Sequence, residues 1–173
     1  MKKLLLTMLL ALAGFNMQAQ FGIKGGFNFS NLKGDGADNF NVLTNWHIGG
    51  LYEIRANNII SFQPELIYSV QGAKLRNDEY KLNYFNVPLM LKVYVTDGFN
   101  LQAGPQFGML LSESDNFSRF KSETFDFGIT GGLEFFLTDG LFIQARYYHG
   151  TKDVTERSDL KNTVVSASLG FIF

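Results

Sequence analysis

Eight charged side chains stand inside stretches of this 173-residue chain where polar and apolar residues alternate. Four are basic and four are acidic: Lys24, Glu53, Arg55, Glu65, Lys92, Asp126, Glu134 and Arg146. A buried charge persists when it is paired and hydrogen-bonded, whereas a lone buried charge is costly or changes its protonation. Most of the eight lie near the ends of their stretches that short turns join, so we expect one structural ion-pair network inside the molecule.

The two histidines, His47 and His149, are the residues best suited to acid–base chemistry. Each stands near the end of an alternating stretch, where His47 with Asp38, or His149 with Asp153, can form a general-base pair. Alternation places His149 on the apolar face, and no Ser or Asp lies at a spacing that is typical of a catalytic site. We therefore expect an interfacial polar residue and no catalytic residue, with an enzyme at the barrel rim kept as an alternative.

Asp35, Asp38 and Asn39 offer oxygen atoms that suit Ca²⁺. Their spacing does not match the D-x-[DN]-x-[DN]-G loop, so solvated loop acids are the expected interpretation. Gly34-Asp35-Gly36 lacks the following Lys and helix of a phosphate-binding loop. We expect no metal site and no cofactor.

The elements that position these side chains alternate with a period of two, which is typical of β-strands. Eight strands are expected, at 21–30, 46–55, 59–71, 84–95, 99–111, 125–137, 141–149 and 163–173. The breaks between them run long, short, medium, short, long, short and long. All tight turns therefore fall at one end and the longer loops, with 31–45, 112–124 and 151–161 among them, at the other, as in bacterial outer-membrane barrels.

The start of the chain has the pattern of a secretory signal peptide. Lys2 and Lys3 precede an apolar run from Leu4 to Phe15, which is too short to span a membrane as a helix, and the small residue Ala19 follows. We expect a signal peptide over 1–19, cleaved after Ala19, and one barrel domain over 20–173. The chain has no Cys, which excludes a lipoprotein anchor and a disulfide framework.

Net charge argues against nucleic acid as a partner. Without Lys2 and Lys3, 13 of the 15 basic residues remain against 16 acidic ones, so residues 20–173 carry a charge of −3. Proteins that bind phosphate backbones carry a basic surplus.

Side-chain size indicates which face of the barrel points outward. The polar face carries eight glycines: Gly22, Gly26, Gly49, Gly104, Gly108, Gly128, Gly132 and Gly170. The apolar face carries three, Gly25, Gly50 and Gly131, among many bulky side chains. Because the inside of an eight-stranded barrel is narrow, the polar face belongs inside and the apolar face meets lipid. The alternative is a soluble periplasmic ligand-binding barrel with the faces reversed.

Aromatic residues near strand ends or on the outward face are expected to anchor the barrel at the lipid headgroups: Phe21, Trp46, Tyr52, Tyr68, Tyr147 and Phe173. Pro64 and Pro88 each remove a ladder donor, so we expect a bulge or local irregularity there.

The last strand resembles the C-terminal signal by which outer-membrane barrels are recognised for assembly. Its apolar positions include Val165, Ala167, Leu169, Phe171 and Phe173. We expect the barrel-assembly machinery to be a partner during insertion.

Five segments together resemble the PorT-like outer-membrane β-barrel family of Gram-negative bacteria. They are 21–28 (FGIKGGFN), 86–92 (NVPLMLK), 104–108 (GPQFG), 126–132 (DFGITGG) and 168–173 (SLGFIF). The resemblance implies an outer-membrane barrel without a catalytic motif, and one branch of the family is associated with protein secretion.

These observations predict an all-β protein, an eight-stranded antiparallel up-and-down transmembrane β-barrel in the cell outer membrane, with lipid as its surroundings. The expected function is a membrane-embedded scaffold without an open channel, whose loops 31–45, 112–124 and 151–161 are available to a protein or surface ligand. A narrow pore, an enzyme at the rim, an accessory role in secretion and the soluble barrel remain alternatives.

Overall fold

The computed structural model describes residues 18–34, 40–75, 78–114, 123–155 and 158–173. Its strands are β1 (Gln18–Gly34), β2 (Phe40–Asn41), β3 (Leu43–Arg55), β4 (Ile60–Leu75), β5 (Asp78–Thr96), β6 (Phe99–Glu113), β7 (Phe125–Phe136), β8 (Leu141–Thr155) and β9 (Ser158–Ile172). Over these ranges, no helix is long and apolar enough to cross a membrane.

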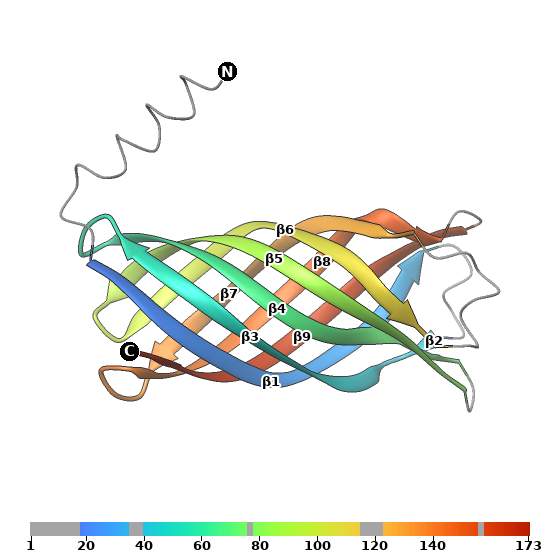
Figure 1. The fold of residues 1–173 in the computed structure, drawn as a ribbon, viewed down its shortest axis with the longest axis horizontal. Coiled ribbons are helices and arrows are strands. Elements are labelled where there is room, and N and C mark those ends of the chain that lie inside the picture. Colours follow the sequence, from blue (N-terminus) through green and yellow to red (C-terminus); the bar gives the residue numbers. More distant parts are fainter. Residues whose placement is uncertain (1–17, 35–39, 76–77, 115–122, 156–157) are drawn as a thin grey trace, which may run out of the picture.

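Eight long strands form one closed antiparallel barrel (Figure 1). Each long strand pairs with its neighbours in the chain, and β1 also pairs with β9. The two-residue β2 pairs with β4 one residue out of the register of β3, so β2 continues β3 across Val42. The predicted eight-stranded up-and-down barrel is confirmed, and the start of β1 lies at the same end as the C-terminus.

The strands close with a stagger that narrows the barrel interior. Following directly paired residues from Gln18 on β1 through every strand leads back to β1 at Asn28, ten residues further along. A closed sheet must be staggered in this way, and with eight strands its interior is just wide enough for side chains to fill. Inward-facing side chains from opposite walls can therefore meet.

The strands extend further toward the loop end than the alternation predicts. Residues 31–34 and 43–45 belong to β1 and β3, although 31–45 was expected to be a loop. In the same way, 151–155 and 158–161 belong to β8 and β9. On these strand ends Leu32, Leu43 and Leu160 are buried inside the barrel, whereas outward positions such as Lys33 and Thr44 are polar, because they lie beyond the apolar band.

Neither proline produces a bulge. The register of β4 against β5 is constant through Pro64 and Pro88, whereas β5 shifts against β6 beside Tyr84 and beside Thr96. Pairing of β3 with β4 is interrupted next to Pro64, and pairing of β4 with β5 is interrupted next to Pro88. Each interruption spans two ladder positions, a local irregularity that leaves the alignment of the strands intact.

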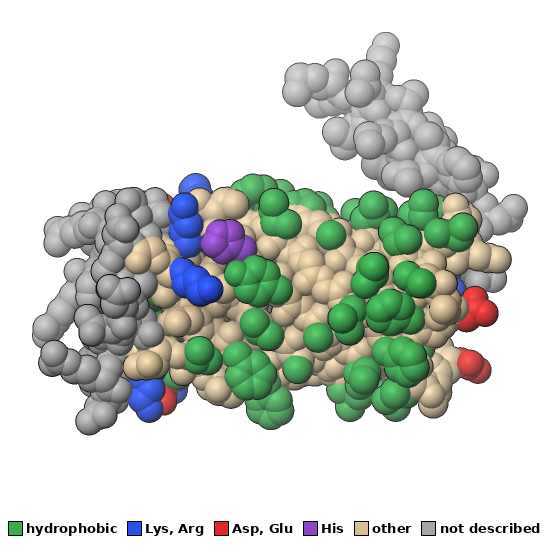
Figure 2. Space-filling model, turned by 180° about the vertical axis from the view of Figure 1, so that it is seen from behind, with side chains coloured by type: hydrophobic (Ala, Val, Ile, Leu, Met, Phe, Trp, Pro, Cys, Tyr) green, Lys and Arg blue, Asp and Glu red, His purple; other side chains and the backbone are tan. Residues whose placement is uncertain are grey.

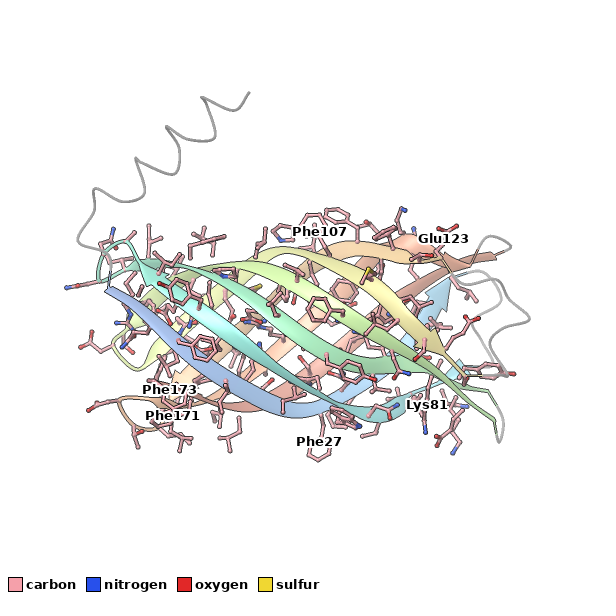
Figure 3. The ribbon with its side chains drawn as sticks, viewed as in Figure 1. Phe27, Lys81, Phe107, Glu123, Phe171 and Phe173 are labelled. Carbon is pink, nitrogen blue, oxygen red and sulfur yellow. The ribbon has the colours of Figure 1, made fainter. Side chains whose placement is uncertain are left out.

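Bulky apolar side chains cover the outside of the barrel. Figure 2 shows them along the wall, and Figure 3 shows Phe27, Phe107, Phe171 and Phe173 pointing away from the barrel. All four are more than 40% exposed, whereas Glu53, Glu65, Lys92 and Glu134 on the opposite face are at most 2% exposed. The apolar face points outward, as predicted, and the soluble barrel with reversed faces is wrong.

Glycines occupy the inward positions where strands approach most closely. A Cβ atom on any of the eight glycines assigned to the polar face would lie 1.9 to 2.8 Å from its nearest neighbour. On Gly25, Gly50 or Gly131 it would lie 3.4 to 3.7 Å away, which is ordinary contact. The inward glycines therefore allow the strands to bend around a filled core.

The lipid-facing position of Leu133 predicts a cost for a charge there. Leu133 lies midway along the outer wall on β7 and is 46% exposed. Because a lysine near the bilayer midplane loses hydration, Leu133→Lys is expected to destabilise the barrel by about 2–4 kcal/mol. The free energy of unfolding from lipid vesicles in denaturant measures this.

Leu137→Lys is the matched control. Leu137 is equally exposed, at 50%, but lies beside the short turn after β7. A lysine there reaches the headgroups and costs at most about 1 kcal/mol. Equal losses of unfolding free energy at both positions would show that the barrel is placed wrongly relative to the bilayer.

Candidate functional site

Glu65 is the centre of the first of two charged clusters inside the barrel. Its Oε2 atom lies 2.8 Å from the Nζ atom of Lys24. Arg146 donates from Nη1 to Oε2 (2.7 Å) and from Nη2 to Oε1 (2.6 Å) of the same carboxylate. Lys24 also donates to Gln144, and Arg146 also donates to Gln102. In this Glu65 cluster, one cation from β1 and one from β8 share a carboxylate of β4.

Lys92 is the centre of the second cluster. Its Nζ atom lies 3.0 Å from Glu53 Oε2 and 2.5 Å from Glu134 Oε1. Glu53 Oε1 also accepts hydrogen bonds from Arg55 Nε (3.1 Å) and from the Tyr94 hydroxyl (2.5 Å). Arg55 is 36% exposed, so this Lys92 cluster reaches the short-turn mouth of the barrel.

Two glutamines join the clusters into one network. Gln144 accepts the hydrogen bond from Lys24 and donates to Glu134 (2.7 Å). Gln63 donates to the Glu65 carboxylate (2.5 Å) and accepts from the Lys92 ammonium (2.9 Å). Every carboxylate oxygen in the network thus has a donor, which is what makes buried ion pairs tolerable.

Asp126 is the one predicted member that lies apart from the network. Its carboxylate is buried against the side chains of Tyr148 and Asn162, nearer the loop end. The positive charge of Lys152 also acts on this carboxylate. The structure therefore brings together seven of the eight predicted residues and places Asp126 one layer above them.

His47 lies inside the barrel and not at its rim. Its Nδ1 atom is 2.9 Å from Asn28 Oδ1, and its Nε2 atom is 2.8 Å from Ser168 Oγ. Asn28 Nδ2 donates to Ser69 and to the carbonyl of Val70, which orients its oxygen toward the histidine. Asp38, the partner suggested for His47 in a general-base pair, lies outside the described residues.

His149 is exposed on the outward face of β8, as alternation predicts. The side chain of Asp153, its suggested partner, lies outside the described part of the chain. The suggested Ca²⁺ ligands Asp35, Asp38 and Asn39 lie outside it as well. Over the described ranges, no group of three or more His, Asp or Glu residues is arranged to hold a metal ion.

An internal cavity of about 40 Å³ lies between the Glu65 cluster and the loop end. The side chains that matter for its chemistry are Lys24, His47, Asn86, Gln106, Thr130 and Arg146. Apart from Ile67 and Val164, its wall is polar or aromatic. It is the natural place for a small polar ligand or water inside the barrel.

Apolar side chains fill the interior on either side of the polar layers. At the loop end, the buried cluster consists of Leu32, Ala73, Leu82, Tyr84 and Leu160. Beside the Lys92 cluster, Leu51, Phe142 and Ile172 fill the opposite wall. Apart from the cavity, the interior formed by the described residues is packed, with an apolar layer across the loop end.

The outer rim carries the predicted anchors. Trp46 and Tyr68 pack with ring centroids 5.4 Å apart, and Tyr52, Tyr147, Phe21 and Phe173 are all exposed. Basic side chains gather next to the loops in Figure 2. In the described ranges, exposed Lys33 and Lys152 lie at this end and exposed Asp97 and Asp139 lie in the short turns at the other.

The predicted assembly signal lies on the outward face of β9. Val165, Ala167, Leu169, Phe171 and Phe173 are exposed, and the Phe173 N–H donates to the carbonyl of Phe21. β1 begins at Gln18, two residues before the expected cleavage point. The signal peptide over 1–19 and the assembly role of β9 stay predictions.

Solved structures with the same architecture are outer-membrane proteins. Ail, the attachment invasion locus protein of Yersinia pestis, matches with a TM-score of 0.59 and 20% identity over 91% of this chain and 100% of Ail. Neisserial surface protein A matches with a TM-score of 0.61 and 12% identity over 90% and 99% of the two chains. Escherichia coli outer membrane protein W matches with a TM-score of 0.51 and 14% identity over 92% and 100%. At these identities the likeness shows the fold.

No curated protein sequence matches this chain. The family model described as "Outer membrane protein beta-barrel domain" matches residues 15–156, most of the sequence. Together with the closed barrel, its apolar outer wall and its charged interior, this match shows that the chain belongs to the outer membrane protein beta-barrel domain family and resides in the cell outer membrane.

Proposed function

We propose that this protein is a membrane-embedded scaffold that presents its outer loops to a protein or surface ligand and has no open channel. The observation that carries the proposal is the filled interior. The ion-pair network spans the barrel on the short-turn side, and the layer of Leu32, Leu82 and Leu160 covers the loop end. Packing of this kind supports a structural role for the barrel wall and leaves the loops as the surface for contacts.

The loops are carried on strands that continue past the apolar band. β1 pairs with β9 as far as Gly34 and Leu160, and β8 pairs with β9 as far as Thr155 and Ser158. Loops held on such extended strands stand clear of the lipid headgroups. We therefore propose that a partner binds to 31–45, 112–124 and 151–161. The strands that carry these segments end on the loop side of the barrel.

Within the family, we propose membership of the PorT-like branch. The segments 86–92 and 104–108 support it, and they form neighbouring parts of β5 and β6. An accessory role in protein secretion follows as an alternative. Deleting the gene and comparing secreted proteins tests it, and an unchanged set of secreted proteins removes the role in secretion.

The filled interior predicts electrical silence. In planar bilayers, the purified protein is expected to give no discrete conductance steps at voltages that leave the membrane intact. The Glu65 and Lys92 clusters fill the path that ions would need through the barrel. A larger barrel of known conductance, inserted in the same bilayer, shows that insertion is being detected. Reproducible steps from this protein would contradict the scaffold and favour the narrow pore.

The rim enzyme remains the second candidate, on the exposed His149 alone. It requires that His149→Ala abolishes cleavage of a lipid or peptide while the barrel stays folded. If His149→Ala leaves this cleavage unchanged, or the wild type cleaves neither substrate, the rim enzyme is excluded.

A further inference from the structure

The internal cavity is lined by donors that have no acceptor among the residues that the structure describes. Lys24 has three N–H groups, and hydrogen bonds to Glu65 and Gln144 use two of them. Arg146 has five N–H groups, and four hydrogen bonds to Glu65 and Gln102 use four. One N–H of each cation is therefore left for another group at the cavity wall.

The strong acceptors around the cavity are already engaged. Both oxygens of Glu65 accept from Lys24 and Arg146. Asn28 Oδ1 contacts the His47 ring, and Gln71 Oε1 accepts from Asn162 at 2.6 Å. A ligand in this cavity meets N–H and O–H groups rather than carboxylates.

Three further polar side chains line the cavity without a partner among the described residues. They are Asn86, Gln106 and Thr130, which are 4%, 8% and 1% exposed. Buried polar groups are normally hydrogen-bonded, and leaving one unpaired is costly. Their amide N–H and hydroxyl groups can therefore complete the shell of an occupant.

The charge around the cavity is positive. Lys24 and Arg146 share the single charge of Glu65, which leaves one positive charge in excess. The two charges of Glu53 and Glu134 are balanced by Lys92 and Arg55, while Asp126 lies against Tyr148 and Asn162. In a low-dielectric interior an uncompensated charge attracts a counter-ion strongly.

We propose that this cavity binds a small monovalent anion of the halide class. Lys24 and Arg146 supply the charge, and Asn86, Gln106 and Thr130 supply hydrogen bonds. A volume of about 40 Å³ exceeds the roughly 10–15 Å³ that a single water needs, so one halide ion with a water fits. The anion acts as a structural counter-ion within the barrel core.

Two measurements with the full barrel test the proposal. Crystals grown in sodium bromide are expected to show an anomalous peak between Lys24 and Thr130. The unfolding midpoint is expected to rise with chloride concentration at constant ionic strength, with gluconate as the replacement anion, because a ligand that binds only the folded state stabilises it. An anomalous peak confined to surface lysines, or equal midpoints in chloride and gluconate, overturns the proposal and leaves water as the occupant.

Thr130→Val separates the site from general salt effects, since it removes one hydroxyl and keeps the shape and charge. The chloride concentration needed for half of the stabilisation is expected to rise about fivefold, as for one lost hydrogen bond. Thr163→Val is the matched control, because the Thr163 hydroxyl is also buried without a partner but does not line the cavity. An equal chloride response in both variants and the wild type contradicts the assignment.

Discussion

Replacing Glu65 with glutamine is expected to destabilise the barrel by about 3–5 kcal/mol. The carboxylate compensates both Lys24 and Arg146, and all three side chains are at most 5% exposed. An amide leaves two buried cations without a counter-charge and turns an N–H group toward them. The unfolding midpoint in denaturant, at an unchanged slope, measures the loss.

Glu79→Gln is the matched control for this change. Glu79 and Lys81 form an ion pair at 2.8 Å, the same distance as Lys24 to Glu65, but their side chains are 43% and 44% exposed. Solvent screens such a pair, so its loss is expected to leave the unfolding midpoint almost unchanged. If both variants unfold at the wild-type midpoint, the interior charges are hydrated and the network does not hold the core together.

Gly104→Ala is expected to prevent or strongly slow folding of the barrel. The added Cβ would lie 1.9 Å from the carbonyl oxygen of Leu89 on β5, so the backbones of β5 and β6 must move apart. Overpacking in a core typically costs about 1–3 kcal/mol, and more where backbone is the obstacle. Heat modifiability on a denaturing gel measures it, because a folded barrel stays compact until it is boiled.

Gly131→Ala provides the comparison. Gly131 lies on β7 beside β6, but its added Cβ would be 3.7 Å from the nearest atom, on the lipid-facing side. It is expected to fold like the wild type. Loss of the folded band in both variants would show that glycine flexibility, and not interior space, is needed in these strands.

The fold was predictable because two independent properties of the sequence agree. Alternation identifies the strands, and the glycines mark the inward face, as Gly104 and Gly131 illustrate. The strand ends were less predictable. Asp153 and Thr155 of β8 pair with β9 beyond the apolar band, and a strand end with such polar residues resembles a loop in the sequence.

Parity predicts which residues face inward, but it does not predict which of them meet. Ser168 is 121 residues from His47, and their contact depends on the stagger of the whole barrel. The same stagger separates Asp126 from the other charges. The position of His47 on the polar face of its strand predicts the burial that the structure shows.

The pairing of β1 with β9 has a consequence for the timing of folding. This seam pairs Gly22 with Ile172. The sheet therefore keeps two free edges until nearly the whole chain is in place. Such distant contacts have a high contact order, which slows folding. Once the seam has formed, every strand has two neighbours and no strand can detach without breaking two ladders. The protein is therefore expected to owe its persistence in the membrane to a slow unfolding rate as much as to its equilibrium stability.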